Sequence, residues 1–131
     1  FRLTKPARID AFQPHMHMRG KAMTLEAILP DNSVEILSSV DRFDFNWHVS
    51  YLYADGFEPL LPAGTVLHMI GIHDNTSANK RNPDPNMWVG FGERSVDDML
   101  QVWINVVYLD DTEYARMVAE RKKAPRSTQQ Q

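Results

Sequence analysis

The sequence predicts an all-β protein, an antiparallel β-sandwich or jelly roll followed by a short C-terminal helix or disordered tail. Residues 1–110 alternate short runs of β-branched, aromatic and alternating apolar residues with turn-forming segments. No internal segment has convincing helical periodicity. The chain has 131 residues, of which 43% are hydrophobic, so we expect one domain with a core of its own.

Six runs are expected to form the strands: 8–17, 23–29, 34–40, 49–53, 65–72 and 101–109. Between them lie Pro30-Asp31-Asn32-Ser33, Asp55-Gly56, Pro62-Ala63-Gly64 and the long stretch 74–86, all rich in turn residues. The first of these segments separates two alternating runs and therefore predicts a hairpin.

We divide the chain into a sandwich domain at 1–111 and a basic tail at 112–131. The tail carries five basic and two acidic residues, whereas the chain as a whole has a net charge of −3. Tyr114, Met117 and Val118 have helical spacing and predict a short helix that packs one face. Residues 124–131 are expected to be a disordered, solvated end rather than a partner-binding segment.

Composition excludes several classes of function. The acidic balance argues against a nucleic-acid partner, and no apolar run is long enough to span a bilayer, so no membrane partner is expected. The absence of cysteine excludes disulfides, zinc–thiolate sites, iron–sulfur clusters and cysteine nucleophiles. Because the chain begins with Phe1, we expect it to be an excised or processed piece.

The segment Pro14-His15-Met16-His17-Met18-Arg19-Gly20-Lys21 carries the strongest chemical signal. Residues two apart in a strand point to the same face, so His15 and His17 would present two imidazoles side by side as a chelate for a transition metal. Met16 and Met18 would then face the core. The alternative, two hydrogen-bonded structural histidines, stays open because imidazole is a common polar group.

A metal would need a third ligand, for which His48, His68, His73, the carboxylates and the methionines are candidates. His68 and His73 should lie on opposite faces of their strand, which favours hydrogen-bonded roles for both. Met99 stands just before the last strand, where core packing is the simpler interpretation. Two imidazoles and a thioether would favour copper, because thioethers stabilise the cuprous ion.

The stretch 74–86 is dense in Asn and Asp. Calcium could use such oxygen ligands, but the spacing does not fit the EF-hand pattern and its glycine is missing. We therefore favour turns stabilised by side-chain-to-backbone hydrogen bonds and by the prolines.

Two motifs together resemble the copper type II, ascorbate-dependent monooxygenases, which include peptidylglycine α-hydroxylating and dopamine β-monooxygenase. The segment 15–21 is similar to the His-x-His-x-x-Gly-Lys motif of that family, and Ser95-Val96-Asp97-Asp98-Met99 resembles its Ser-x-Asp-Glu-Met segment. The likeness covers residues 8–110 and points to bacterial relatives and to the C-terminal half of the two-domain enzymes.

The resemblance implies that His15, His17 and Met99 hold the catalytic copper, which activates O2 for hydroxylation of a C–H bond. It also implies a parent protein whose N-terminal half carries a second, electron-transferring copper and which uses ascorbate or another electron donor. Nothing in this chain resembles that half, so we expect the chain alone to be inactive. Asp97, Asp98 and Asn75 are candidates for fixing the ring tautomers of the histidines.

Two departures bear on the substrate. Gln13 replaces the arginine that anchors a substrate carboxylate in the peptide-processing branch, and Trp103 replaces a tyrosine. We therefore expect a small apolar or aromatic compound rather than a glycine-extended peptide. Trp103 and Trp47 are candidate pocket residues, although core packing is the favoured interpretation of both.

Two other hypotheses remain: a non-catalytic copper-binding or protein-interaction module, and a purely structural sandwich whose His and Met residues only pack. The resemblance further implies a periplasmic or secreted location, because the family is mostly lumenal or secreted.

Overall fold

The structure is a computed structural model that describes residues 1–123. The segment 124–131, expected to be disordered, lies outside the described residues. The elements are β1 (Ala7–Met16), β2 (Gly20–Ile28), β3 (Val34–Val40), β4 (Tyr51–Leu52), β5 (Leu60–Leu61), β6 (Val66–His73), β7 (Leu100–Tyr108) and α1 (Asp111–Lys123).

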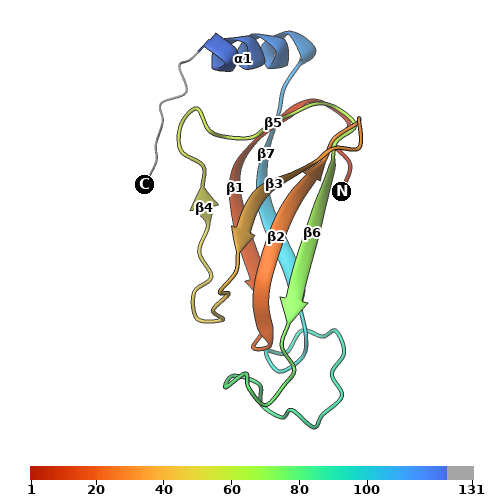
Figure 1. Cartoon of the computed structure of the whole chain (residues 1–131), viewed down its shortest axis with the longest axis vertical. Coiled ribbons are helices and arrows are strands. Elements are labelled where there is room, and N and C mark those ends of the chain that lie inside the picture. The colour runs from red at the N-terminus through yellow and green to blue at the C-terminus, as the bar shows by residue number, and fades with distance from the viewer. Residues whose placement is uncertain (124–131) are drawn as a thin grey trace.

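The strands form two antiparallel sheets, which confirms the predicted all-β sandwich. In one sheet β1 pairs with β7 on one side and with β4 and β5 on the other. The other sheet has the order β3-β2-β6. In Figure 1 the two sheets lie face to face, with α1 at one end and the long connection from β6 to β7 at the other.

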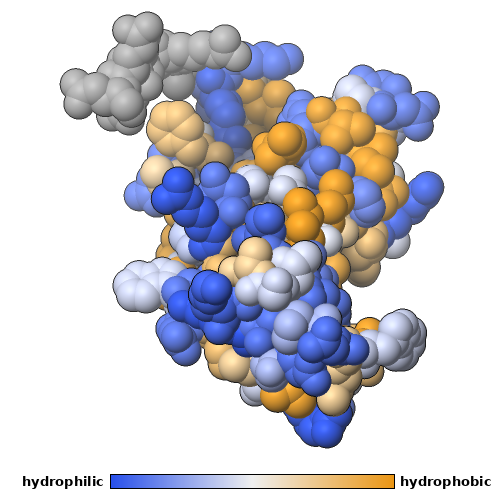
Figure 2. All heavy atoms as spheres, turned by 60° about the horizontal axis from the view of Figure 1, so that its bottom comes forward, coloured by the Kyte–Doolittle hydropathy of each residue, from blue (hydrophilic) through white to orange (hydrophobic). Residues whose placement is uncertain are grey.

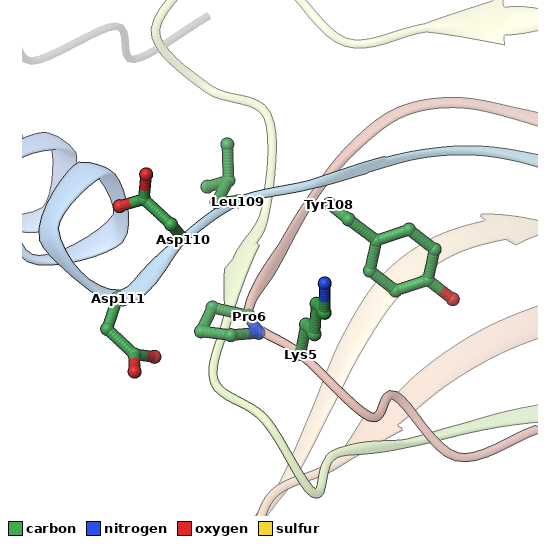
Figure 3. Close-up of a pocket in the computed structure, with 6 residues that line it drawn as sticks. All are labelled: Lys5, Pro6, Tyr108, Leu109, Asp110 and Asp111. Atoms are coloured by element: carbon green, nitrogen blue, oxygen red, sulfur yellow. The ribbon is translucent and has the colours of Figure 1, made fainter.

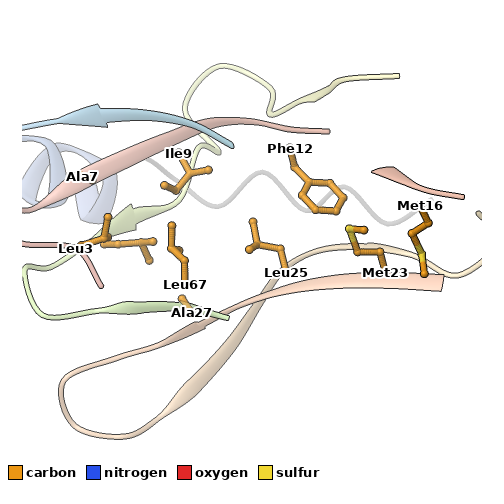
Figure 4. Packing of buried hydrophobic residues seen from close by; sticks show 10 residues of the cluster. Leu3, Ala7, Ile9, Phe12, Met16, Met23, Leu25, Ala27 and Leu67 are labelled. Carbon is orange, nitrogen blue, oxygen red and sulfur yellow. The ribbon is translucent and has the colours of Figure 1, made fainter. Parts of the chain in front are cut away.

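The core lies between the sheets because inward-facing residues alternate with outward-facing ones along β1 and β2. Ile9, Phe12 and Met16 of β1 meet Met23 and Leu25 of β2, as Figure 4 shows. Met16 is fully buried, as predicted. The prediction for Met18 is wrong, because β1 ends at Met16 and Met18 lies half-buried in the following turn.

The hairpin predicted at Pro30–Ser33 is confirmed between β2 and β3. The Leu29 amide donates to the Ser33 carbonyl at 2.8 Å, and the Asp31 carboxylate accepts from the Ser33 amide at 2.9 Å. Asn32 adopts a left-handed conformation with φ of 66°, which Asn tolerates better than most residues.

The largest differences from the predicted elements occur in short pairings. The run 49–53 forms only the two-residue β4, and β5 was not expected, because two residues carry no periodicity to detect. The predicted C-terminal helix is confirmed as α1, with Tyr114, Met117 and Val118 half-buried on one face. No helix among residues 1–123 is long and apolar enough to cross a membrane.

Candidate metal centre

The structure brings His15 and His17 together at the end of β1. His15 is the outward-facing residue between the buried Pro14 and Met16, and His17 follows the last residue of the strand. Their ring centroids are 5.3 Å apart and the ring planes are nearly perpendicular, at 79°. His17 is only 5% exposed, whereas His15 is half-buried.

The tautomer of His17 is fixed by the backbone of the segment that precedes β7. Its Nδ1 lies 3.1 Å from the carbonyl oxygen of Asp97, which can only accept a hydrogen bond, so Nδ1 carries the proton. The lone pair of Nε2 is then free to bind a metal, the arrangement usual for histidine ligands. Asp97 therefore acts through its carbonyl, because its carboxylate is bound by Arg94 at 2.6 and 3.0 Å.

The register of β1 and β7 indicates a position for Met99 near this pair. The β1–β7 ladder ends with the pairs His15–Gln101 and Met16–Leu100, so continuing this register by one residue beyond both strands would bring Met99 opposite His17. Residues directly opposite in a ladder share a face. Met99 is buried, and its carbonyl accepts a hydrogen bond from His73 Nε2 at 3.2 Å. His17 and Asp97, 80 positions apart in the sequence, thus meet at one corner of the sandwich.

A third imidazole, that of His48, packs on His15. The two ring centroids are 4.6 Å apart with an interplanar angle of 39°. His48 comes from the segment between β3 and β4, together with Phe43 and Phe45, whose rings lie 5.6 and 5.3 Å from that of His48. Sequence reasoning counted His48 only among several candidate ligands, because no local pattern shows that this segment crosses to the other sheet.

The pKa of His15 is lowered from its ordinary value of 6.5. Burial is the main cause, since it disfavours the charged ring, and the charges of His48 and His17 lower the pKa further. A lowered pKa keeps the ring neutral, which is the form that binds metals, to more acidic pH.

His68 and His73 lie on opposite faces of β6, as expected. His68 is exposed and pairs with Glu26 at 3.2 Å, and His73 holds the carbonyl of Met99. Among residues 1–123, no group of three or more His, Cys, Asp or Glu side chains is arranged to hold a metal ion. A metal at the His15–His17 pair would therefore need a donor of another kind, and register makes the Met99 thioether the candidate.

Arg19 fastens the turn after His17 to the long 74–99 connection. Its guanidinium is almost fully buried, donates to Asn82 Oδ1 at 2.9 Å and to the Val96 carbonyl, and lies 3.9 Å from Asp98 Oδ1. That buried carboxylate oxygen has no hydrogen-bond partner among the described residues. Arg19 is thus a structural link for the segment that supplies Asp97 and Met99.

The polar 74–86 stretch forms the hydrogen-bonded turns that we favoured. Asp74 Oδ1 accepts from the Thr76 amide at 3.1 Å and from its hydroxyl at 2.7 Å. Asn79 donates to the carbonyls of Met18 and Asp74 at 3.3 and 3.0 Å, which ties the stretch to the histidine turn. Asn75 reaches Asp98 Oδ2 at 3.3 Å rather than a histidine ring.

Gly20 allows the chain to turn tightly beside the pair. A Cβ at this position would lie 2.5 Å from Met16 Cβ and 3.1 Å from the His17 carbonyl oxygen. Such contacts are far inside van der Waals distance, so glycine is the residue that fits. The glycine of the His-x-His-x-x-Gly-Lys pattern therefore has a steric reason in this chain.

The preference for core packing of Trp103 and Trp47 is wrong. Trp103 is 53% exposed and Trp47 is 65% exposed. Trp103 faces outward because it belongs to the same alternate set of β7 residues as Gln101 and Asn105. Its ring meets that of His15 nearly edge-on, with centroids 5.5 Å apart. The indole therefore places an apolar surface directly beside His15.

Two of the hollows in the described part of the chain lie at opposite ends of the sandwich. One, of about 280 Å³, lies at the base of α1, at the opposite end of β1 from His15; Figure 3 shows Lys5, Tyr108 and Asp111 among its lining residues. A cleft of about 580 Å³ lies at the other end, between Arg19, Asp97 and exposed apolar side chains such as Trp88. Figure 2 shows that this end of the molecule is hydrophilic over much of its surface, with separate hydrophobic groups.

No protein-family model matches the chain, and neither the curated proteins nor the solved structures contain a match. The resemblance to the copper monooxygenases rests on the two motifs alone.

Proposed function

We propose that this chain is the copper-binding domain of a copper type II, ascorbate-dependent-like monooxygenase, with His15, His17 and Met99 as the copper ligands. The observation that carries the proposal is the paired imidazoles at the end of β1, with the free Nε2 of His17 set by the Asp97 carbonyl. Met99 stands two residues after Asp97, and continuing the β1–β7 register by one residue would bring it opposite His17, where its thioether would supply the soft donor that favours cuprous copper.

The spacing of the two rings fits a shared metal ion. A metal–nitrogen bond of about 2.0 Å places the ion roughly 3.2 Å from each ring centroid, so two rings on one ion have centroids at most about 6.4 Å apart. The observed separation of 5.3 Å lies within that limit. Two imidazoles and one thioether leave a coordination position open, as a catalytic metal requires.

Copper bound here would supply one-electron redox chemistry towards O2 for hydroxylation of a C–H bond. His15 and His17 would bind through neutral nitrogens, and the Asp97 carbonyl would keep the His17 ring in its ligand tautomer. Trp103 beside His15 offers a flat apolar surface, which supports a small apolar or aromatic substrate.

The electron balance supports a partner domain. Hydroxylation by O2 leaves the second oxygen atom as water and consumes two electrons from a reductant, whereas one copper ion passes one electron at a time. We therefore propose an N-terminal electron-transfer copper domain in the parent protein, with ascorbate or a similar donor. With this function we also propose that the parent protein is periplasmic or secreted, as the family resemblance implies.

Copper titration under anaerobic conditions tests the site. We expect about one Cu(I) per chain, measured by competition with a chromophoric chelator, and loss of binding in His17→Ala and Met99→Ala. The matched controls are His68→Ala and Met87→Ala, since His68 is exposed on the other sheet and Met87 is exposed in the 74–99 connection. Equal binding by His17→Ala and the wild-type chain would overturn the proposal.

The burial of His17, only 5% exposed, favours a second candidate, a module that retains copper without turnover. The two candidates differ in one result. The enzyme domain hydroxylates an apolar test substrate when its electron-transfer half and ascorbate are supplied, whereas the storage or interaction module binds copper and forms no product.

A further inference from the structure

We propose that His48 is a positioning residue that presets the ring of His15 for metal binding, an inference that rests on the proposed copper site. His48 is not assigned as a ligand, because no three-histidine arrangement able to hold a metal occurs among residues 1–123. The contact that carries the inference is the packing of the two imidazoles, with centroids 4.6 Å apart.

His48 is itself held in place from several directions. Its Nε2 lies 3.4 Å from the Met16 carbonyl oxygen, which fixes Nε2 as the protonated nitrogen. Phe43 packs on it at 5.6 Å in a tilted arrangement, and Phe45 packs nearly edge-on at 5.3 Å. Phe45 also reaches His17, at 6.3 Å, so the same small aromatic group touches both members of the pair.

The segment that carries His48 is anchored on both sides. The Phe43 amide donates to the Lys21 carbonyl at 2.9 Å, next to the histidine turn. Asp44 forms a two-pronged ion pair with Arg81 of the 74–99 connection. His48 therefore reaches His15 from a backbone that is fastened to β2 and to the segment preceding β7.

The effect on His15 follows from its two neighbours. Its ring contacts both Trp103, nearly edge-on at 5.5 Å, and His48, tilted at 4.6 Å. Rotation of the ring would disturb at least one of these contacts. A ligand whose orientation is set before binding loses less freedom when the metal arrives, and groups that orient ligands typically contribute about 10–100-fold to metal affinity.

Three substitutions separate the features of His48. His48→Ala removes both the ring and the donor, His48→Phe keeps a packing ring, and His48→Gln keeps a donor without the ring. We expect His48→Ala to weaken Cu(I) binding about tenfold and to alter the Cu(II) electron paramagnetic resonance spectrum. His48→Phe should restore most of the affinity, because packing on His15 carries the effect, and His48→Gln should not.

The matched control is His68→Ala, which removes a histidine from the other sheet. Thermal unfolding of the metal-free variants identifies a merely structural role: His48→Ala and His48→Phe should both be fully folded at the temperature of the copper titration but should differ in copper affinity. Wild-type affinity and spectrum in His48→Ala would overturn the inference. Complete loss of binding in His48→Ala, equal to that in His17→Ala, would also overturn it by making His48 a ligand.

A metal-free measurement separates this inference from the proposed function. In the nuclear magnetic resonance spectrum of the apo-protein, the ring protons of His15 and His48 should show mutual Overhauser effects, and the His15 signals should broaden or shift in His48→Ala. Absence of that contact overturns the inference whatever the copper result. If His17→Ala loses copper binding but His48→Ala binds copper like the wild-type chain, the proposed copper site is supported and only the positioning role of His48 is overturned.

Discussion

Gly20→Ala tests whether the tight turn after β1 determines both the stability and the metal site. The added Cβ would lie 2.5 Å from Met16 Cβ, 3.0 Å from Phe43 Cδ1 and 3.1 Å from the His17 carbonyl oxygen. Met16 Cβ is attached directly to the β1 backbone and is fully buried, so it cannot swing aside. The backbone conformation of Gly20 is not left-handed, and the effect is therefore one of space alone.

The size of the effect follows from that distance. Carbon atoms in contact sit about 3.5–4.0 Å apart, so the join of β1 and β2 must open by about 1–1.5 Å. Overpacking of this kind costs about 1–3 kcal/mol. With about 4 °C per kcal/mol for a chain of this size, we expect the Tm to fall by about 4–12 °C. His17 moves with the turn, so copper affinity should fall at least tenfold.

The assay is thermal unfolding and Cu(I) competition on Gly20→Ala beside Gly90→Ala. Gly90 is the matched control, because its nearest neighbour would be a Trp88 ring atom at 3.6 Å, an ordinary contact. We expect Gly90→Ala to remain within about 0.5 kcal/mol of the wild-type chain. A Gly20→Ala protein with the stability and copper affinity of Gly90→Ala would refute the steric argument.

Three further predictions concern titration and the 74–99 connection. Burial lowers the pKa of His15, so its ring signals in the metal-free protein should titrate below pH 6.5. The folded state should accordingly lose stability as the pH falls below that value, because the unfolded chain then binds more protons. Titration of the His15 ring above pH 6.5 would contradict this effect of burial. The pKa of Asp44 is held below 3.8, chiefly by hydrogen bonds from Arg81, so the stabilisation by this pair is complete above about pH 4 and is lost at lower pH. The difference in urea midpoint between the wild-type chain and Asp44→Asn should therefore shrink from about pH 7 to about pH 3, and a constant difference would exclude this linkage. Arg19→Met leaves the Asp98 carboxylate without its buried cation, so the free energy of unfolding should fall by about 3 kcal/mol. Residues 74–99 should also become sensitive to limited proteolysis before global unfolding. Protease resistance equal to that of the wild-type chain would count against the structural role of Arg19.

The strands and the outward position of His15 could be predicted because both depend on the period of two along a single segment, whereas His17 lies just beyond β1 and stays near His15 through its closeness in sequence. His15 and Met16 are neighbours on one strand, and their opposite directions follow from the pleat alone. The outward position of Trp103 was also predictable in principle, since polar Gln101 and Asn105 stand two residues to either side. The size and hydrophobicity of tryptophan favour burial, but in this strand the alternation determines which way the side chain faces, so the expectation of core packing is wrong.

His48 could not be placed from the sequence for a different reason. Its contacts come from β1, from the 41–50 segment and, through Asp44, from Arg81, and none of these is close to the others along the chain. Pairing of distant segments depends on sheet order, which a single sequence with short strands does not specify. The same holds for the Asp97 carbonyl. Every residue has a backbone carbonyl, so no residue type in the sequence indicates which one accepts the hydrogen bond from His17.

The site is therefore built from one local part and one distant part. The turn at the end of β1 supplies two imidazoles that are close in sequence. The Asp97 carbonyl and Met99 come near them only when the 74–99 connection packs against this turn. Arg19, Asn79 and Asn82 hold that connection against the turn, so in the proposed site their hydrogen bonds would determine whether two donors or three are available to the metal. Two imidazoles alone bind many transition metals, and in the proposed site the Met99 thioether would supply the preference for cuprous copper. Metal selectivity should accordingly depend on residues of the connection that touch no metal, and a variant in which the connection opens should keep weak binding of divalent ions while it loses the preference for Cu(I).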